Sequence, residues 1–143
     1  TASDMILDPF CGSGHFLSRC LAYVVKNQGE SLDPYALHQF KFFHLHGIEK
    51  SDRMVRIAMT DMMLHDDGHT NIRNLDSLLS FENYPDIVAL GDQERQTPEV
   101  FSMILTNPPF GSIMRQEVME MVGRFQLGNK KKSLSLLFSE SMI

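Results

Sequence analysis

The feature that most constrains this chain is the tetrapeptide 107–110, Asn-Pro-Pro-Phe, which directly follows the short apolar run 101–106. A short apolar run of this kind is typical of a buried strand. Two consecutive prolines cannot continue a strand ladder or enter a helix interior, because each lacks a backbone N–H and has a fixed φ. The strand is therefore predicted to end at Asn107, in a stiff edge of one amide, two prolines and one aromatic ring. In open α/β sheets the carboxyl ends of the strands are where ligands bind.

These four residues suit chemistry on an exocyclic amine of a nucleobase, whose delocalised lone pair makes it a poor nucleophile. The Asn107 carboxamide oxygen and the Pro108 carbonyl oxygen can accept its two N–H groups, which frees the lone pair to attack an electrophilic methyl group. Phe110 can stack on the base, a contact that contributes about 1–3 kcal/mol. Pro108 and Pro109 would hold these groups in place before the reaction. The alternative is a strand-ending turn with a buried Phe, and the tetrapeptide alone does not decide between the two.

A second motif lies near the start of the chain, where residues 8–14 read Asp-Pro-Phe-Cys-Gly-Ser-Gly. It closes the apolar run 5–7, which predicts a strand, and precedes a helical pattern. Two glycines in this context permit a tight turn whose backbone approaches a ligand at a helix N-terminus. The dinucleotide fingerprint requires a third glycine, but position 17 is Leu17. The loop is therefore not expected to cradle a pyrophosphate, and a nucleotide-dependent oxidoreductase is a weak interpretation.

Acidic residues follow two further predicted strands. Glu49 follows the run 42–48, and Asp76 follows the short run 71–75. A carboxylate at the tip of the second strand is well placed to accept ribose hydroxyls, although it can instead interact with the dipole of the next helix. Asp76 can accept from an adenine amino group or can cap a turn. Both alternatives stay open for each residue.

Helical patterns separate these strands. Apolar residues at helical spacing predict a helix from Phe16 that ends near Gly29, a second helix after Ser51, and helical segments after Gly111. The alternation predicts an α/β fold with a doubly wound, mainly parallel sheet. Four strands are evident, so we expect residues 1–143 to form one partial domain, truncated after the fourth strand and its following helix.

Composition narrows the class further. The chain is 43% hydrophobic and 22% charged, which is ordinary for a soluble protein, and the net charge of −5 argues against a strong grip on nucleic acid by this chain alone. No apolar run is long enough for a membrane span, and the N-terminus has no signal-peptide form. Cys11 and Cys20 form neither a disulfide framework nor a paired metal motif. His44 and His46 lack an evident third ligand, so no metal site is expected. A reducing, cytoplasmic compartment is predicted.

Residues 8–16 resemble the first motif of the S-adenosylmethionine-dependent N6-adenine DNA methyltransferases, and residues 107–110 resemble their fourth, catalytic motif. Residues 48–49 and 74–76 fall where that family has its second and third motifs. The order and spacing are similar to those of the group that contains the modification subunits of type I restriction systems. The resemblance covers nearly the whole chain and implies a Rossmann-like, class I methyltransferase fold.

The resemblance also implies a cofactor, S-adenosyl-L-methionine, and a role for each motif residue. The first motif would line the methionine end of the cofactor, Glu49 would bind the ribose and Asp76 the adenine ring. Asn107 and Pro108 would hold the target amine. The implied cofactor-binding set is Asp8, Pro9, Cys11, Gly12, Gly14, Phe16, Glu49, Asp76 and Asn107, and the implied catalytic set is Asn107, Pro108, Pro109 and Phe110.

The implied substrate is an adenine of DNA that is flipped out of the duplex, and the implied partners are specificity and restriction subunits of a restriction-modification system. No membrane partner is expected. The family's upstream cofactor motif would precede Thr1, and its later strands would follow Ile143, which leaves open whether this chain alone is active. Two alternatives remain. The first is an N-methyltransferase with the same site that acts on RNA bases or protein glutamine. The second is a non-catalytic cofactor-binding module of a larger assembly.

Overall fold

The computed structural model of this chain describes residues 1–65, 71–78 and 101–108. The chain divides into two compact units. The first consists of Thr1–Ser77 and Phe101–Asn107, and all the described helices and strands belong to it. Leu78 and Pro108 are the described residues of the second unit. The sheet and the segments that follow its strands up to Asn107 are therefore part of one body.

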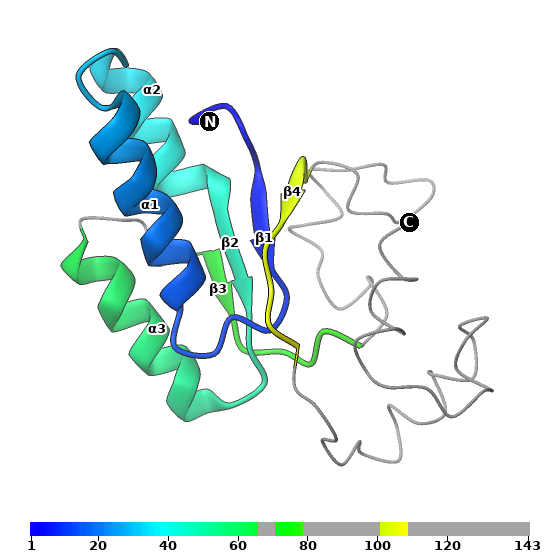
Figure 1. The fold of residues 1–143 in the computed structure, drawn as a ribbon. Helices are drawn as coiled ribbons and strands as arrows, with labels where there is room; N and C mark the ends of the chain where they lie inside the picture. Colours follow the sequence, from blue (N-terminus) through cyan, green and yellow to red (C-terminus); the bar gives the residue numbers. More distant parts are fainter. Residues whose placement is uncertain (66–70, 79–100, 109–143) are drawn as a thin grey trace. The chain divides into compact units, whose positions relative to one another are not determined.

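The first unit is a parallel sheet with helical connections (Figure 1). Its elements are β1 (Ile6–Asp8), α1 (His15–Gln28), α2 (Pro34–Gln39), the π-helical turn η1 (Phe40–His44), β2 (Leu45–Ile48), α3 (Asp52–Leu64), β3 (Ile72–Arg73) and β4 (Met103–Ile104). The strand order is β3-β2-β1-β4, and every pair is parallel. Ile6 pairs with Leu45 on one side and with Met103 on the other. The direction of winding therefore reverses at β1, the kind of switch point at which α/β sheets bind ligands.

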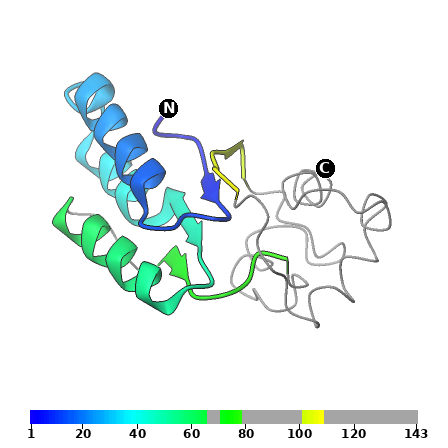
Figure 2. The same ribbon diagram turned by 60° about the horizontal axis from the view of Figure 1, so that its bottom comes forward.

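The helices α1 and α3 lie side by side against one face of the sheet in both views (Figures 1 and 2). Helix α1 packs on β1 and β2, and α3 packs on β3. Each helix connects two parallel strands, as such crossovers require. The predicted α/β class with a mainly parallel sheet is confirmed. The helical segments predicted after Gly111 lie outside the described residues.

The predicted start and end of α1 are confirmed. The helix begins after Gly14 and is followed by Gly29, whose N–H is bonded to the carbonyl of Val25. Its buried apolar residues are Leu17, Leu21 and Val24, which recur at a spacing of three to four residues. The apolar pattern that predicts this helix also includes Phe16 and Val25, but these two side chains are not buried, since they are 46% and 41% exposed. Each is one residue, or about 100°, off the stripe.

The strand predicted over residues 42–48 begins only at Leu45, so the prediction is wrong for its first three residues. The Asp33 side chain accepts from two backbone N–H groups and thereby caps α2, and the chain then continues as η1. Phe40 is fully buried in this turn. A helical path through these aromatic residues buries Phe40, which a strand pattern read from apolar content alone does not reveal.

The strand predicted over residues 101–106 is present, but only as Met103–Ile104, and it is not buried. The two side chains are 38% and 39% exposed. Among the described strands β4 is at the end of the order, and α1 and α3 pack over the other three strands instead. A short apolar run in the sequence does not show whether the strand will be central and buried or, like β4, not covered by the described helices.

The core lies between the helices and the sheet. Val55, Ala58 and Met62 of α3 are buried there together with Leu17 and Leu21 of α1. The predicted apolar face of the helix after Ser51 is thus confirmed at these positions. Within the described ranges, no helix is long and apolar enough to cross a membrane.

Candidate active site

All the segments that follow the described strands leave the sheet at one edge, the lower edge in Figure 1, which Figure 2 turns toward the viewer. This common edge follows from the parallel pairing of the strands. Residues 9–14 follow β1, Glu49 follows β2, and Asp76 comes three residues after β3. Asn107 comes three residues after β4. Residues 9–14, Glu49, Asp76 and Asn107 therefore follow the strands at the carboxyl edge of the sheet.

The bend after β1 requires glycine for two different reasons. Gly12 and Gly14 have φ values of 53° and 81°, in the left-handed region that other residues rarely adopt. A Cβ on Gly14 would also lie 3.2 Å from the Cβ of Ala58, so the absent side chain lets α3 approach the loop. A Cβ on Gly12 would meet only the Met54 Cε, at 4.0 Å. The Gly12 backbone thus borders open space that a ligand can use.

The Glu49 carboxylate joins the exit of β2 to this bend. Its Oε2 accepts from the Gly12 N–H at 3.1 Å, and its Oε1 accepts from the Ser51 N–H at 2.7 Å. The Cys11 N–H also donates to the Ile48 carbonyl, at 3.0 Å. Because Ser51 is the residue from which α3 starts, the carboxylate lies beside both the glycine loop and a helix N-terminus. Both roles considered for Glu49 are compatible with this position, since each carboxylate oxygen retains a further acceptor site.

Asp8 ends β1 and is almost fully buried, with 1% of its surface exposed. Its Oδ1 accepts from the Phe10 N–H at 3.1 Å. Burial, with a smaller contribution from the nearby charge of Glu49, raises the pKa of this carboxyl from 3.8 to about 6, although the Thr106 side chain and the Phe10 N–H act in the opposite direction. A buried acid of this kind at the carboxyl edge of the sheet favours a cation beside it.

Pro9 and Cys11 have buried side chains, so any contact of theirs with a ligand runs through the backbone. A Cβ added to Gly47 would lie only 2.9 Å from the Cys11 sulfur. This close approach explains why β2 has a glycine at position 47. Burial, followed by the charges of Asp8 and Glu49, raises the pKa of the Cys11 thiol to about 12. The free thiol is thus protonated at neutral pH, which disfavours its reaction as a nucleophile.

The segment after β3 is tied to both neighbouring loops. The Asn74 side-chain amide donates to the Glu49 carbonyl at 3.0 Å, and the Ser77 hydroxyl donates to the Pro9 carbonyl. Half-buried Asp76 lies between these two anchors. Sequence reasoning missed Asn74 and Ser77 as site residues. The only signal was a pair of short polar side chains flanking an acidic residue after a strand, which also describes an ordinary turn.

The exit of β4 runs beside β1. The Leu105 N–H donates to the Leu7 carbonyl at 3.1 Å, which extends the pairing beyond the strand itself. The buried Thr106 hydroxyl oxygen has no hydrogen-bond partner among the described residues. Asn107 is exposed, so its carboxamide does not point into the hydrophobic core. Pro108 belongs to the second unit, and Pro109 and Phe110 lie outside the described residues.

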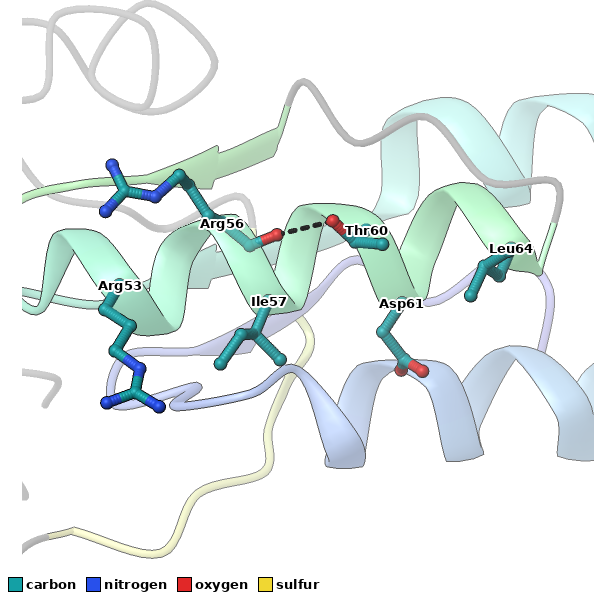
Figure 3. A pocket seen from close by; sticks show the side chains of 6 residues that line it. All are labelled: Arg53, Arg56, Ile57, Thr60, Asp61 and Leu64. Atoms are coloured by element: carbon teal, nitrogen blue, oxygen red, sulfur yellow. Dashed lines mark hydrogen bonds between the residues drawn. The ribbon is translucent and has the colours of Figure 1, made fainter.

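Phe16, predicted to support the cofactor pocket, lines a different space. Its exposed ring borders an apolar cavity of about 340 Å³ between α1, β1 and β4, together with Tyr23 and Met103. A second hollow, of about 560 Å³, is lined only by residues of α3 (Figure 3). Thr60 in that hollow donates its hydroxyl to the Arg56 carbonyl at 2.8 Å. Neither cavity is lined by the residues that follow the strands, apart from Leu105 in the first.

Metal-ion chemistry finds no support in the described part of the chain. No group of three or more His, Cys, Asp or Glu side chains is arranged there to hold a metal ion. His46, one of the two histidines considered, is buried, and one ring nitrogen lies 2.8 Å from the Phe43 carbonyl and the other 3.2 Å from an Arg73 guanidinium nitrogen. Its nitrogens are therefore engaged in packing the sheet.

The fold and the site together define a class. The sheet is parallel and reverses its winding at β1, which leads into a glycine-rich bend, and acidic residues lie at or after the ends of β1, β2 and β3. The chain belongs to the N-6 DNA methylase family, whose model matches residues 1–142. The predicted family is thereby confirmed.

Known proteins similar to this chain agree with that assignment. The type II restriction enzyme and methyltransferase RM.BcgI of Heyndrickxia coagulans is 35% identical over 81 residues, which are 57% of this chain and 12% of that protein. The M protein of the type I restriction enzyme EcoKI shares the fold with a TM-score of 0.65, at 20% identity over 99% of this chain and 27% of that one.

A modification subunit of a putative type I restriction enzyme from Vibrio vulnificus YJ016 has a TM-score of 0.68, at 22% identity. That similarity covers 96% of this chain and 25% of the other. The chain thus spans 12% of the curated relative's length and about a quarter of these solved chains. At sequence identities of 20% and 22%, the similarity to these solved structures supports the fold alone.

Proposed function

We propose that the protein transfers a methyl group from S-adenosylmethionine to the N6 amino group of adenine in DNA, as part of a restriction-modification system. The observation that carries the proposal is the meeting of two motifs at neighbouring strand ends. The acidic, glycine-rich bend follows β1, and Asn107 follows its partner β4. Membership of the N-6 DNA methylase family supports the reaction, and relatives named as restriction-modification enzymes support the setting.

The residues after β1, β2 and β3 fit the proposed cofactor. The open space beside Gly12 suits a ligand that approaches the backbone, and the buried Asp8 carboxylate suits the cationic methionine end. Glu49 retains acceptor sites for ribose hydroxyls, and Asp76 is the acceptor proposed for the adenine amino group. The bound cofactor supplies the electrophilic methyl group. The protein would contribute orientation: as the N–CH3 bond forms and the S–CH3 bond breaks, the positive charge would pass from sulfur to the amine nitrogen, which the acceptor oxygens would stabilise until the nitrogen releases one proton to water.

The residues after β4 would act on the target base. The Asn107 side-chain oxygen and the Pro108 carbonyl would accept the two N–H groups of the amine, so that its lone pair points at the methyl group. Pro109 would keep Pro108 rigid, and Phe110 would stack on the base, which must leave the duplex to reach the site. Holding the amine in this geometry lowers the entropic part of the barrier.

The net charge and the cysteines of the chain bear on its partners and its cellular compartment. A net charge of −5 gives the chain little attraction for a phosphate backbone, so we assign most of the DNA affinity to specificity and restriction subunits. Both cysteines, Cys11 and Cys20, are free thiols, in keeping with a reducing cytoplasm.

The proposal is tested by radiolabelled methyl transfer from S-adenosylmethionine to pools of DNA, RNA and protein, with the full-length protein and its Asn107→Ala variant. We expect label in DNA, recovered as N6-methyladenine after digestion, and loss of that label in the variant. Label in RNA or in protein glutamine would replace the DNA substrate. Binding of the cofactor without label in any pool would indicate a cofactor-binding module.

A further inference from the structure

We infer that Asn74 and Ser77 are positioning residues of the cofactor site, which hold Asp76 against the other two strand exits. This inference rests on the proposed function, because it assigns the held segment to the adenine end of the cofactor. Asn74 lies within the stretch 74–76 that falls at the family's third motif, but the resemblance implies a role there only for Asp76, and Ser77 lies outside that stretch. What brings them forward is the geometry of two hydrogen bonds that cross from one strand exit to the others.

The first anchor lies where the sheet ends. The Glu49 N–H donates to the Arg73 carbonyl at 3.0 Å, the last backbone bond between β2 and the β3 exit. One residue later, the Asn74 amide donates back to the Glu49 carbonyl, also at 3.0 Å. Asn74 thus keeps the segments that follow β2 and β3 attached to each other beyond the last backbone hydrogen bond of the sheet. It does so with a side chain, because the backbones separate there.

The second anchor lies on the loop after β1. The Ser77 hydroxyl donates to the carbonyl of Pro9, a buried residue at the start of the glycine bend. Residue 76 therefore has an attachment point two residues before it and another directly after it. With both ends of a four-residue segment attached, few backbone conformations remain for Asp76, and its carboxylate is held in place before any ligand arrives.

The locations of Asn74 and Ser77 suit residues that position a loop and not residues that pack the core. Asn74 is exposed and Ser77 is half-buried, so removal of either side chain leaves no cavity in the apolar core. The Glu49 carboxylate continues the same chain of contacts to the Gly12 N–H. The three loops that would surround a cofactor are thus joined by side chain-to-backbone bonds, and Asn74 and Ser77 provide two of the joints.

The chain offers matched controls. Asn71 lies at the opposite end of β3, and its amide donates to the Phe42 carbonyl at 2.9 Å, a bond of the same type and length. Thr60 donates its hydroxyl to a backbone carbonyl on the outer side of α3. Asn71→Ala and Thr60→Ala remove the same kinds of hydrogen bond without touching the three loops.

The test is calorimetric titration of S-adenosylmethionine into the full-length protein. We expect Asn74→Ala and Ser77→Ala each to weaken binding about 3- to 10-fold, the effect of one neutral hydrogen bond. The two control variants should remain within about twofold of the parent protein. Ser77→Thr keeps the hydroxyl and should restore binding. Equal losses in Asn74→Ala and Asn71→Ala, or no rescue by Ser77→Thr, would overturn the positioning role.

A double-mutant cycle separates positioning from general weakening. If Asn74 acts through Asp76, the change Asn74→Ala should have little effect once Asp76→Ala is present. Additive losses would instead mean that Asn74 acts independently of Asp76. Failure of the proposed function looks different, because the parent protein would then neither bind the cofactor nor lose methyl transfer with Asn107→Ala. A parent that does both, with additive variants, retains its function and refutes only the positioning role.

Discussion

The exits of β1, β2 and β3 differ in construction from the exit of β4. The first three are joined to one another by the Glu49 carboxylate, the Asn74 amide and the Ser77 hydroxyl, each bonded to backbone of a neighbouring loop. The exit of β4 pairs with β1 through the Leu105 N–H, after which Asn107 is exposed. One half of the candidate site is thus held by cross-links between loops, whereas the described exit of β4 up to Asn107 is attached to β1 alone, by backbone pairing and by the Thr106 side chain beside Asp8.

The contrast matches a division of labour in the proposed reaction. A cofactor that binds in every cycle gains affinity from loops that are already ordered, because little conformational freedom is then lost on binding. A base that must enter from a duplex needs an open approach. The Thr106 side chain lies at the junction of the two halves, beside Asp8, and lowers the pKa of that carboxyl. The comparison predicts that the two halves fail in separable ways when they are mutated.

The largest expected effect concerns the half after β4. Asn107→Ala in the full-length protein should lower the rate of methyl transfer by about 100- to 1,000-fold or more, since it removes an acceptor that acts on the reacting amine. Cofactor binding should largely survive, with a loss much smaller than that of transfer, because the cross-linked loops that would hold most of the cofactor do not include Asn107. Single-turnover transfer and calorimetry measure the two quantities. Asn71→Ala, which removes a structural amide, is the matched control for activity. Parallel loss of transfer and cofactor binding would erase the division between the halves.

The positions of the strand ends and of the glycine bend were predictable from the sequence, because they depend on the pattern of neighbouring residues. An acidic residue at the end of an apolar run marks a strand end: Asp8 is the last residue of β1 and Glu49 directly follows β2, whereas Asp76 comes three residues after β3. Parallel pairing then brings them to one edge without any further information. Gly12 and Gly14 were identifiable because their positive φ values follow from a sharp strand-to-helix bend.

The remainder depends on tertiary contacts that no local pattern encodes. The bond from Gly12 to Glu49 joins residues 37 positions apart, and the bond from Ser77 to Pro9 joins residues 68 positions apart. The inward side chain of Cys11 is determined by the space over Gly47. The turn at Phe40–His44 follows from the burial of Phe40, which competes with the strand preference of the same aromatic residues.

The next effect tests whether the bend after β1 is a rigid part of the cross-linked half. Gly14→Ala should destabilise the protein by about 2–4 kcal/mol, from about 1–2 kcal/mol of left-handed strain and a further cost of overpacking. The overpacking arises because the new Cβ would lie 3.2 Å from the Cβ of Ala58. Denaturant unfolding of the free protein measures the loss.

Two companion variants divide that loss into its parts. Adding Ala58→Gly to Gly14→Ala should recover part of the overpacking cost and leave the backbone strain. Gly12→Ala should show the strain alone, since its Cβ would meet only the Met54 Cε at 4.0 Å. If Gly12→Ala and Gly14→Ala are equally destabilising, contact with α3 does not contribute to the rigidity of the bend.

A smaller effect is expected at the joint between the first two exits. Glu49→Ala should weaken cofactor binding about 10- to 100-fold, because it removes charge-assisted bonds to Gly12 and Ser51 as well as the proposed ribose acceptor. Glu30→Ala, at an exposed position after α1, is the control for loss of charge. Calorimetry provides the affinity and thermal unfolding the stability. Lower stability with unchanged affinity would leave Glu49 a purely structural joint.

The pH dependence of the Asp8 carboxyl refines the comparison in the free protein. With its pKa raised from 3.8 to about 6, the folded state binds more protons than the unfolded state between these values. Stability therefore falls as pH rises through this window and is level above it. Asp8→Asn should raise the unfolding free energy by about 2–3 kcal/mol at pH 7 and have little effect at pH 3.5. Equal effects at the two pH values would mean that burial does not disfavour the Asp8 charge.

The smallest effect concerns the bound state. A cationic methionine end beside Asp8 would favour the carboxylate form, so affinity should increase with pH up to about 6 and then level off. Binding at pH 5 should be about tenfold weaker than at pH 7, and Asp8→Asn should abolish most of that difference. The cofactor's own ammonium group keeps its charge over this range, because its pKa is near 8. Affinity in the parent protein that does not change between pH 5 and 7 would place the cation away from β1. The cross-linked half would then hold the cofactor in another orientation.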